Sequence, residues 1–369
     1  MKTLRQGFSK GRKTMNILEN REGYRLGGRS SWQNGILYLA YSASYIEFCC
    51  EGSCKVTAEL ISDGIPEGKE FTAWAAVFVN DEEQPGKRFV VKKGSNLYVL
   101  YEGSKQEKVK IRLMKYSVAA FSSLGIVKID VEGGKLLPPP KAQEKLIQFI
   151  GDSITCGYGI EGKVEVDVFN TAQENPWNAY ACQTARSLHM DFELVSWSGN
   201  GIISHYVDEW INEPRHDSPW MPELYSYSDR ALEESRLGIP EEDLTVWKEE
   251  KEPDIIVVHL GTNDGSYTRF IEERNAAFVQ GYVSFLKQIR QLHEKAPIIC
   301  MLGVMRQELN DQVAKAVALT RQQGDSNVYF LEVPLAREWD GLGTDYHPSL
   351  RTHEKMAELL TQYIHFITE

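Results

Sequence analysis

Three consecutive prolines, Pro138–Pro140, divide the chain into two parts with different sequence patterns. Proline fixes its own φ and has no backbone N–H, so a run of three forms an extended segment that suits neither a helix nor the interior of a sheet. Before the prolines, short apolar runs alternate with turn residues. After them, apolar runs alternate with helical stretches. We therefore predict one domain at 1–137, a Pro-rich linker at 138–144 and a second domain at 145–369.

The part before the prolines has the pattern of an all-β domain. Residues 109–115 alternate apolar and polar side chains, which is typical of a strand with one buried face. Similar aromatic and β-branched runs are separated by turn pairs such as Asn34-Gly35 and Asp63-Gly64. The runs lie at 36–41, 71–79 and 96–101. Many short strands with regular turns predict a β-sandwich, and within that class we favour a jelly roll.

The part after the prolines alternates strands and helices. Residues 254–260 form a continuous apolar run, which is typical of a parallel strand buried on both faces. Further strands are predicted at 146–150, 192–197, 298–304 and 328–333, and helices at 176–188, 275–294, 311–323 and 349–368. This alternation predicts an α/β domain with a parallel sheet covered on both faces. Residues 204–252 break the rhythm and are predicted to be an insertion that lines a site or an interface.

Charge and apolar patterning exclude several classes of protein. The chain has 41 Lys and Arg against 52 Asp and Glu, a net charge of −11, so no general attraction to nucleic acid or to an anionic lipid surface is expected. No run of 18 apolar residues is present, and a membrane span is not predicted. The basic first residues are not followed by the apolar stretch of a signal peptide, so we expect a cytoplasmic protein.

The six cysteines are expected to be reduced thiols, many of them buried. Cys49, Cys50 and Cys54 cluster, but their spacing fits no standard zinc pair, and neither a metal nor a cofactor is predicted. Gly157–Gly162 matches G-x-G-x-x-G, a pattern that binds phosphate only between a strand and a helix. Because the residues that follow it are not helical in pattern, nucleotide binding is disfavoured.

Chemistry-bearing residues follow the predicted strands of the second domain. Ser153 follows the strand at 146–150, Gly199 the strand at 192–197 and Asn263 the strand at 254–260, while His347 lies between the last strand and the last helix. In open α/β sheets, ligands bind beyond the carboxyl ends of the strands. A hydroxyl, a base and hydrogen-bond donors at one edge are the groups that acyl transfer needs.

These segments resemble the GDSL, or SGNH, hydrolases: Gly-Asp-Ser at 151–153, Ser-Gly-Asn-Gly at 198–201, Gly-Thr-Asn-Asp at 261–264 and His-Pro at 347–348. With the β-rich domain in front, the chain is similar to carbohydrate esterase family 2, which contains acetyl xylan esterases. The resemblance implies a flavodoxin-like catalytic domain and a serine esterase that removes O-acetyl groups from xylan-derived or related oligosaccharides. It implies an acetylated saccharide as the partner, and no cofactor.

The resemblance also assigns roles to these residues. Ser153 would be the nucleophile that forms an acyl-enzyme, and His347 the general base and then acid. The backbone N–H groups of Ser153 and Gly199 and the side-chain amide of Asn263 would form the oxyanion hole.

The third member of the site is left open by the sequence. The superfamily usually has Asp three residues before the histidine, but here that position is Thr344, and Asp345 is two residues before it. Either Asp345 or a backbone carbonyl would orient His347, and we favour the carbonyl and a Ser–His dyad. Tyr346 would stack on a sugar ring, with ordinary packing as the alternative.

Two other functions remain open. One is an acyl-thioesterase or lipid esterase on the same scaffold, which would have a long apolar channel for the acyl chain. The other is a carbohydrate-binding protein with an inactive esterase domain, in which the sandwich would bind the ligand. The short linker favours a sandwich packed against the second domain. A homo-oligomer is plausible on general grounds alone.

Overall fold

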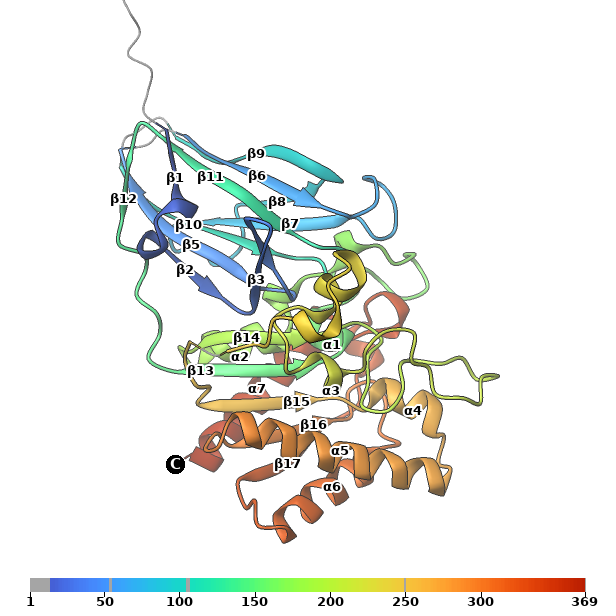
Figure 1. The fold of residues 1–369 in the computed structure, drawn as a ribbon. Helices are drawn as coiled ribbons and strands as arrows, with labels where there is room; N and C mark the ends of the chain where they lie inside the picture. Colours follow the sequence, from blue (N-terminus) through green and yellow to red (C-terminus); the bar gives the residue numbers. More distant parts are fainter. Residues whose placement is uncertain (1–13, 53–54, 104–106, 249, 369) are drawn as a thin grey trace, which may run out of the picture.

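A computed structural model describes residues 14–52, 55–103, 107–248 and 250–368, with a β-sandwich above an α/β domain in Figure 1. One sheet of the sandwich has the order β3-β4-β11-β6-β9, with β1 paired to β11, and the other has the order β12-β5-β10-β7-β8, with β2 paired to β5. All of these pairings are antiparallel. The strands are β1 Thr14–Asn16, β2 Tyr24–Gly27, β3 Ser30–Gln33, β4 Ile36–Leu39, β5 Tyr45–Glu51, β6 Lys55–Ser62, β7 Ala73–Val79, β8 Lys87–Val91, β9 Gly94–Glu102, β10 Lys108–Lys115, β11 Gly125–Glu132 and β12 Lys135–Leu137.

The alternating pattern at 109–115 gives β10 its two faces. Val109, Ile111 and Leu113 are buried in the core between the two sheets, whereas Lys110 and Arg112 point away from that core. Arg112 instead contacts Glu47 of β5. The prediction of an all-β first part is therefore confirmed.

The second part is a five-stranded parallel sheet with the order β14-β13-β15-β16-β17. In chain order this is 2-1-3-4-5, the flavodoxin-like arrangement, and the predicted fold class is confirmed. Its strands are β13 Leu146–Gly151, β14 Asp191–Ser196, β15 Ile255–His259, β16 Ile298–Leu302 and β17 Val328–Glu332. Its α-helices are α1 Ser153–Cys156, α2 Tyr180–Ser187, α3 Met221–Leu224, α4 Thr262–Thr268, α5 Glu272–Leu292, α6 Asn310–Gln322 and α7 Leu350–Thr368.

Helices cover both faces of the parallel sheet. In β15, Ile256 and Val258 face the core that contains α5 and α6, while Ile255 and Val257 face the core that contains α2 and α7. Both faces are apolar because both are covered, which explains the continuous apolar run at 254–260. The carboxyl ends of the strands point toward the side of Figure 1 where α1 and α4 lie.

The sandwich packs directly onto the α/β domain. Tyr41 of the sandwich belongs to the core on the α5 side, and Tyr45 and Tyr116 belong to the core on the α2 side. Between the two domains, residues 138–145 form neither a helix nor a strand. The two domains thus share buried apolar surface.

The described residues of the insertion, 204–248 and 250–252, form only short elements and contribute to this interface. Arg29 Nη1 donates to the carbonyl of Tyr227, and Ser31 Oγ donates to Glu233 Oε1 over 2.6 Å. Of the two predicted roles, lining a site or lining an interface, these contacts show the second. Five of the cysteines are free and buried, and Cys54 lies outside the described residues. Among the described helices, none has the length and apolarity needed to span a bilayer.

Candidate active site

Ser153 lies at the first turn after β13. Asp152 is the N-cap of α1, and its Oδ1 accepts a 3.0 Å hydrogen bond from the N–H of Ile154. Ser153 is the first residue of the helix, so its own N–H has no intrahelical acceptor. Asp152 therefore fixes the turn, and the turn presents the Ser153 hydroxyl and N–H on the same side as the strand ends.

The fold brings Ser153 and His347 together from positions 194 residues apart. His347 Nε2 lies 2.8 Å from Ser153 Oγ, and His347 Nδ1 lies 3.2 Å from the carbonyl oxygen of Asp345. Burial lowers the pKa of His347 to about 4, and the Asp345 carbonyl offsets part of that effect. A neutral imidazole that donates from Nδ1 has its Nε2 lone pair directed at the serine, which is the arrangement of a general base.

The carboxylate of Asp345 is engaged elsewhere. Tyr158 Oη donates to Asp345 Oδ2 over 2.8 Å, and Asp345 itself has a φ of 53°. This left-handed conformation, which is uncommon for residues other than glycine, aims the Asp345 carbonyl at the imidazole. The sequence left open whether a carboxylate or a backbone carbonyl orients His347. In the structure, the backbone carbonyl of Asp345 faces His347 Nδ1.

Gly199 lies in the turn after β14, on the same edge of the sheet. Its φ is 78°, and a Cβ at this position would meet no heavy atom within 4 Å. Its carbonyl accepts from the N–H of Tyr206 over 2.9 Å, while among the described residues its own N–H has no acceptor. An open space with a free N–H beside it is what an oxyanion site requires.

The side-chain amide of Asn263 lies between this turn and Asp152. Asn263 Nδ2 donates to the carbonyl of Asn200 over 2.8 Å and to Asp152 Oδ2 over 3.3 Å. The second contact is at the long end for an N–H···O bond, so the corresponding N–H is the one that an oxyanion can recruit. The structure thus brings Ser153, Gly199, Asn263 and His347 to one edge.

Asp264 holds the Gly199 turn from the other side. Its Oδ1 accepts from the N–H groups of Ile202, Ile203 and Ser204 at 2.8–3.2 Å. Burial raises the pKa of Asp264 to about 6, and the three N–H groups oppose that rise. Asp264 therefore holds this loop in place.

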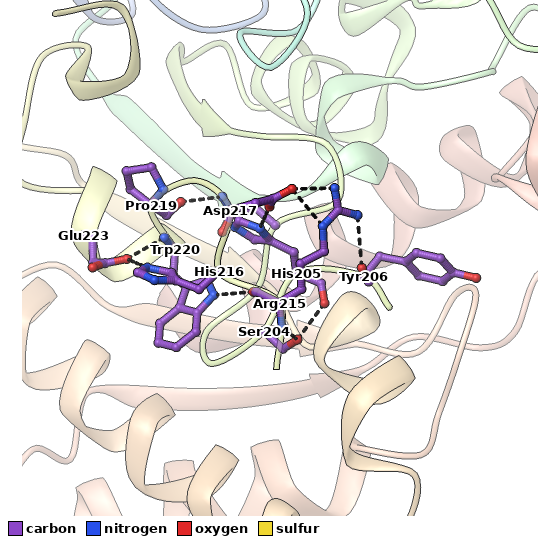
Figure 2. Close-up of polar contacts among 10 residues, drawn as sticks. Ser204, His205, Tyr206, Arg215, His216, Asp217, Pro219, Trp220 and Glu223 are labelled. Carbon is purple, nitrogen blue, oxygen red and sulfur yellow. Dashed lines mark hydrogen bonds and ion pairs between the residues drawn. The ribbon is translucent and has the colours of Figure 1, made fainter. Parts of the chain in front are cut away.

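The loop that carries Gly199 continues into a segment that is tied to itself by polar side chains (Figure 2). His205 Nδ1 lies 2.8 Å from Asp217 Oδ1, and Arg215 binds the other oxygen of the same carboxylate at 2.6 Å. Trp220 Nε1 donates to the Arg215 carbonyl over 2.9 Å. These contacts lie outside any helix or strand, and they give the loop a defined shape.

Tyr346 borders the site at its solvent side. Its side chain is 58% exposed, and its Oη donates to Glu165 Oε1 over 2.7 Å. The exposed ring, held by its hydroxyl, presents a flat apolar face on which a pyranose can stack. Its exposure disfavours the alternative that Tyr346 packs in a core.

Two aromatic residues near His347 were not singled out by sequence reasoning. Tyr158 and Phe169 stack with ring centroids 3.6 Å apart, and the Tyr158 ring lies 4.3 Å from that of His347. Phe169 also lines a hollow of about 470 Å³, to which the sandwich contributes Glu70, Thr72 and Trp74. Tyr158 lies within the Gly157–Gly162 motif. That motif was considered only for phosphate binding, so the tyrosine inside it was not considered as a neighbour of His347.

Two further histidines, His259 and His353, are buried beneath the site. Burial lowers the pKa of each to about 3, and His353 Nδ1 accepts from the N–H of Tyr180. His259 is a core residue of strand β15. Within the described chain, no three His, Cys, Asp or Glu side chains are grouped so as to hold a metal ion.

A 2-1-3-4-5 parallel sheet with these four segments at its carboxyl edge defines the SGNH hydrolase fold. Residues 149–355 match the GDSL-like Lipase/Acylhydrolase family, and the chain belongs to that family. Residues 26–140 match the family described as Carbohydrate esterase 2 N-terminal. The two matches together confirm the resemblance to carbohydrate esterase family 2.

Two named relatives are similar to this chain in sequence. The chain is 33% identical over 257 residues to "Cellulase/esterase CelE" of Acetivibrio thermocellus, covering 68% of this chain and 29% of that protein. It is 27% identical over 244 residues to an "Acetylxylan esterase / glucomannan deacetylase" of Cellvibrio japonicus, covering 66% of this chain and 62% of that protein. The chain thus spans less than two thirds of the length of either relative.

Solved structures share the whole fold. A family two carbohydrate esterase from Clostridium thermocellum, in complex with cellohexaose, superposes with a TM-score of 0.80 at 29% identity, covering 93% of this chain and 98% of that one. An acetyl xylan esterase, Est2A, from Butyrivibrio proteoclasticus has a TM-score of 0.82 at 22% identity, covering 97% and 99%. Both the sandwich and the α/β domain are included in these superpositions.

Proposed function

We propose that this protein is a serine esterase that removes O-acetyl groups from xylan-derived or related oligosaccharides. The observation that carries the proposal is the 2.8 Å contact between Ser153 Oγ and His347 Nε2, with Nδ1 oriented by the Asp345 carbonyl. A neutral imidazole in this position can accept the serine proton. The named relatives support the choice of acetylated saccharides as the substrate class.

The reaction follows from the positions of these groups. His347 Nε2 takes the proton of Ser153 as Oγ attacks the acetyl carbonyl carbon. The negative charge on the carbonyl oxygen is stabilised by the N–H groups of Ser153 and Gly199 and by the Asn263 amide. Collapse of the intermediate breaks the bond to the sugar oxygen, which receives the proton from His347, and leaves an acetyl group on Ser153. Water, deprotonated by the same imidazole, then attacks the acetyl carbon; the bond to Ser153 Oγ breaks, Oγ takes the proton back from His347, and acetate leaves.

The surroundings of the dyad support a saccharide as the alcohol part of the ester. Tyr346 offers an exposed ring beside the histidine, and the hollow next to Phe169 provides space on the side of the sandwich. We propose that the sugar carrying the acetyl group contacts Tyr346 and that the sandwich, through Glu70 and Trp74, shapes the end of the cleft.

From the sequence alone we also propose a cytoplasmic location, jelly-roll connectivity of the sandwich and a homo-oligomeric assembly. A cytoplasmic enzyme would act on short, imported acetylated oligosaccharides. Fractionation of cells that express a tagged protein tests the location, and sedimentation tests the assembly.

The test of the function is acetate release from acetylated xylo-oligosaccharides, beside hydrolysis of p-nitrophenyl acetate and octanoate. We expect acetate-selective hydrolysis that is lost in Ser153→Ala and kept in Ser95→Ala, since Ser95 hydrogen-bonds only at the surface of the sandwich. A preference for octanoate would instead favour the lipid-esterase alternative. Saccharide binding without ester hydrolysis would favour the inactive-domain alternative.

A further inference from the structure

The segment that carries His347 packs on the Gly157–Gly162 turn of the α/β domain. Thr344 is fully buried there: its N–H donates to the carbonyl of Gly159 over 3.1 Å, and its own carbonyl accepts from the N–H of His347 over 3.2 Å. A Cβ at Gly159 would lie 2.8 Å from the Thr344 carbonyl oxygen, so the two backbones are in close contact. The position of Thr344, and with it that of His347, therefore depends on the position of this turn.

A second segment, residues 171–175, holds Thr344 through its side chain. Thr344 Oγ1 donates to Gln173 Oε1 over 2.7 Å. The same segment also binds the turn, because the N–H of Glu161 donates to the carbonyl of Gln173 over 3.2 Å. The two segments thus hold Thr344 together, and we call them the histidine support (residues 157–162 and 171–175).

One side chain of the sandwich contacts both segments of the histidine support. Arg88 lies on β8, and its Nη1 contacts Glu161 Oε2 in the turn at 2.7 Å. Its Nη2 donates to the carbonyls of Ala172 and Glu174 over 2.7 and 3.1 Å. These two carbonyls flank Gln173 in the chain. The planar guanidinium group therefore joins the turn to the second segment, since its donors are fixed relative to one another.

Two aromatic rings of the sandwich help to fix the guanidinium group of Arg88. The group lies over the rings of Trp74 and Tyr116, 5.9 and 4.9 Å from their centroids, and the side chain is 21% exposed. Cations are attracted to the faces of such rings, and hydrogen bonds from a charged donor are shorter and stronger than neutral ones. Arg88 is thus fixed to the sandwich at one side and to the histidine support at the other.

We infer that Arg88 is a positioning residue for His347, and that the sandwich is in this way part of the esterase site. Arg88 holds the histidine support, and the support fixes the segment that places His347 Nε2 beside Ser153 Oγ. A displacement of about 1 Å at a reacting group can lower a rate by about 10²-fold, so a contact outside the dyad can affect kcat. The inference rests on the proposed role of His347 as the general base.

The experiment compares two arginines of the sandwich in the full chain. Arg88→Met removes the contacts with the histidine support, whereas Arg25→Met, the matched control, removes an ion pair with Asp191 at the amino end of the parallel sheet. The two side chains are 21% and 17% exposed, and both join the domains. We expect kcat for p-nitrophenyl acetate to fall about ten- to hundredfold in Arg88→Met, with KM little changed, and to be unchanged in Arg25→Met. Arg88→Lys keeps the charge and can still donate to a carbonyl, so it should restore part of the loss.

A second readout follows the imidazole itself and does not need hydrolysis. In protein labelled with ¹⁵N at histidine, the ring signals of His347 report which nitrogen carries the proton, and they are assigned by their absence in His347→Gln. We expect a single tautomer, with the proton on Nδ1, in the wild type and in Arg25→Met. In Arg88→Met we expect a mixture of tautomers, because the Asp345 carbonyl is no longer held at Nδ1. A general loss of stability in both arginine variants would not produce this difference.

The outcomes separate this inference from the proposed function. Unchanged kcat in Arg88→Met, or equal losses in Arg88→Met and Arg25→Met, overturns the positioning role. A fall in kcat with unchanged His347 signals also overturns it, because Arg88 would then act through another group. If Arg88→Met does not fold, Glu161→Ala removes the same ion pair at a side chain that is 41% exposed, and the same two changes are expected. A wild type without esterase activity contradicts the proposed function, whereas a change of the His347 signals in Arg88→Met would still support the coupling of Arg88 to His347.

Discussion

The hydroxyl of Tyr158 donates a 2.8 Å hydrogen bond to Asp345 Oδ2 and so holds the residue whose carbonyl faces His347. The two residues lie 187 positions apart, in the segments that follow the first and last strands of the parallel sheet. Asp345 is solvent-exposed and has a positive φ, a conformation that the local sequence does not favour on its own. The Tyr158 contact is therefore an external restraint on the segment that orients the imidazole.

Replacing Tyr158 by Phe tests this restraint. The change removes the hydrogen bond to Asp345 and keeps the ring stacked between Phe169 and His347. We expect kcat for p-nitrophenyl acetate to fall about tenfold, the equivalent of about 1.4 kcal/mol, with little change in KM.

Tyr346→Phe is the matched control for Tyr158→Phe. It removes an exposed hydroxyl contact with Glu165 and should leave kcat for this small substrate unchanged. Equal losses in both variants would show that Tyr158 does not orient His347.

The pH dependence of the reaction should have a lower limit set by His347. Burial lowers the pKa of this imidazole to about 4, so it is neutral and able to accept a proton at all higher pH values. As the pH falls through 4, protonation removes the base, and kcat/KM should fall about tenfold per pH unit. Acetate release measured from pH 3 to 6 checks this, with near-UV circular dichroism to show that the fold persists. A midpoint near 6.5 would mean that His347 is not desolvated in the working enzyme.

An upper limit is expected from Asp152. Burial raises the pKa of this carboxyl to about 7, and its Oδ2 lies 3.3 Å from Asn263 Nδ2. Above that pH the ionised carboxylate competes with the oxyanion for the Asn263 amide, so kcat should decline. Asp152→Asn removes the titration and can still cap α1 through its side-chain oxygen. The decline above pH 7 should therefore disappear in Asp152→Asn, and its persistence there would point to another group.

Loss of the Asn263 amide should reduce catalysis without abolishing it. Removing one oxyanion donor typically lowers kcat by about 10²–10³, and the two backbone N–H groups remain in Asn263→Ala. The measurement is kcat on acetylated xylo-oligosaccharides, with Ser153→Ala setting the background. Asn310→Ala, at a buried asparagine on α6 that contacts Glu332, is the control for general destabilisation. A loss of less than threefold would exclude Asn263 from the oxyanion site.

The positions of three of the four site residues could be predicted because the apolar pattern of each strand in the sheet is local. Continuous apolar runs identify the buried strands. The carboxyl ends of parallel strands lie at one edge of the sheet, whatever conformation the loops adopt. Ser153, Gly199 and Asn263 each follow such a run directly. His347 lies 15 residues after β17, and it could be placed only through its family motif.

Contacts between loops could not be predicted in the same way. Tyr158, Phe169 and Glu165 lie in a segment without regular structure, where no period links sequence to direction. Strand β5 was missed for a related reason. Tyr45 contacts the core of the α/β domain while Ile46 and Phe48 occupy the core of the sandwich, so β5 is buried on both sides and lacks the alternation of an exposed strand.

One of the ion pairs that join the two domains is buried. Arg29 Nε lies 3.0 Å from Glu193 Oε1, with the two side chains 1% and 4% exposed, and Arg21 lies at the same distance from Glu250 with both side chains more than half exposed. Arg29→Met leaves a buried carboxylate without its partner and should lower the free energy of unfolding by about 3–5 kcal/mol. Arg21→Met should change it by less than about 1 kcal/mol, because an exposed pair is screened by water. Urea denaturation of both variants measures the difference, and similar small losses in the two would show that the domains do not depend on this pair.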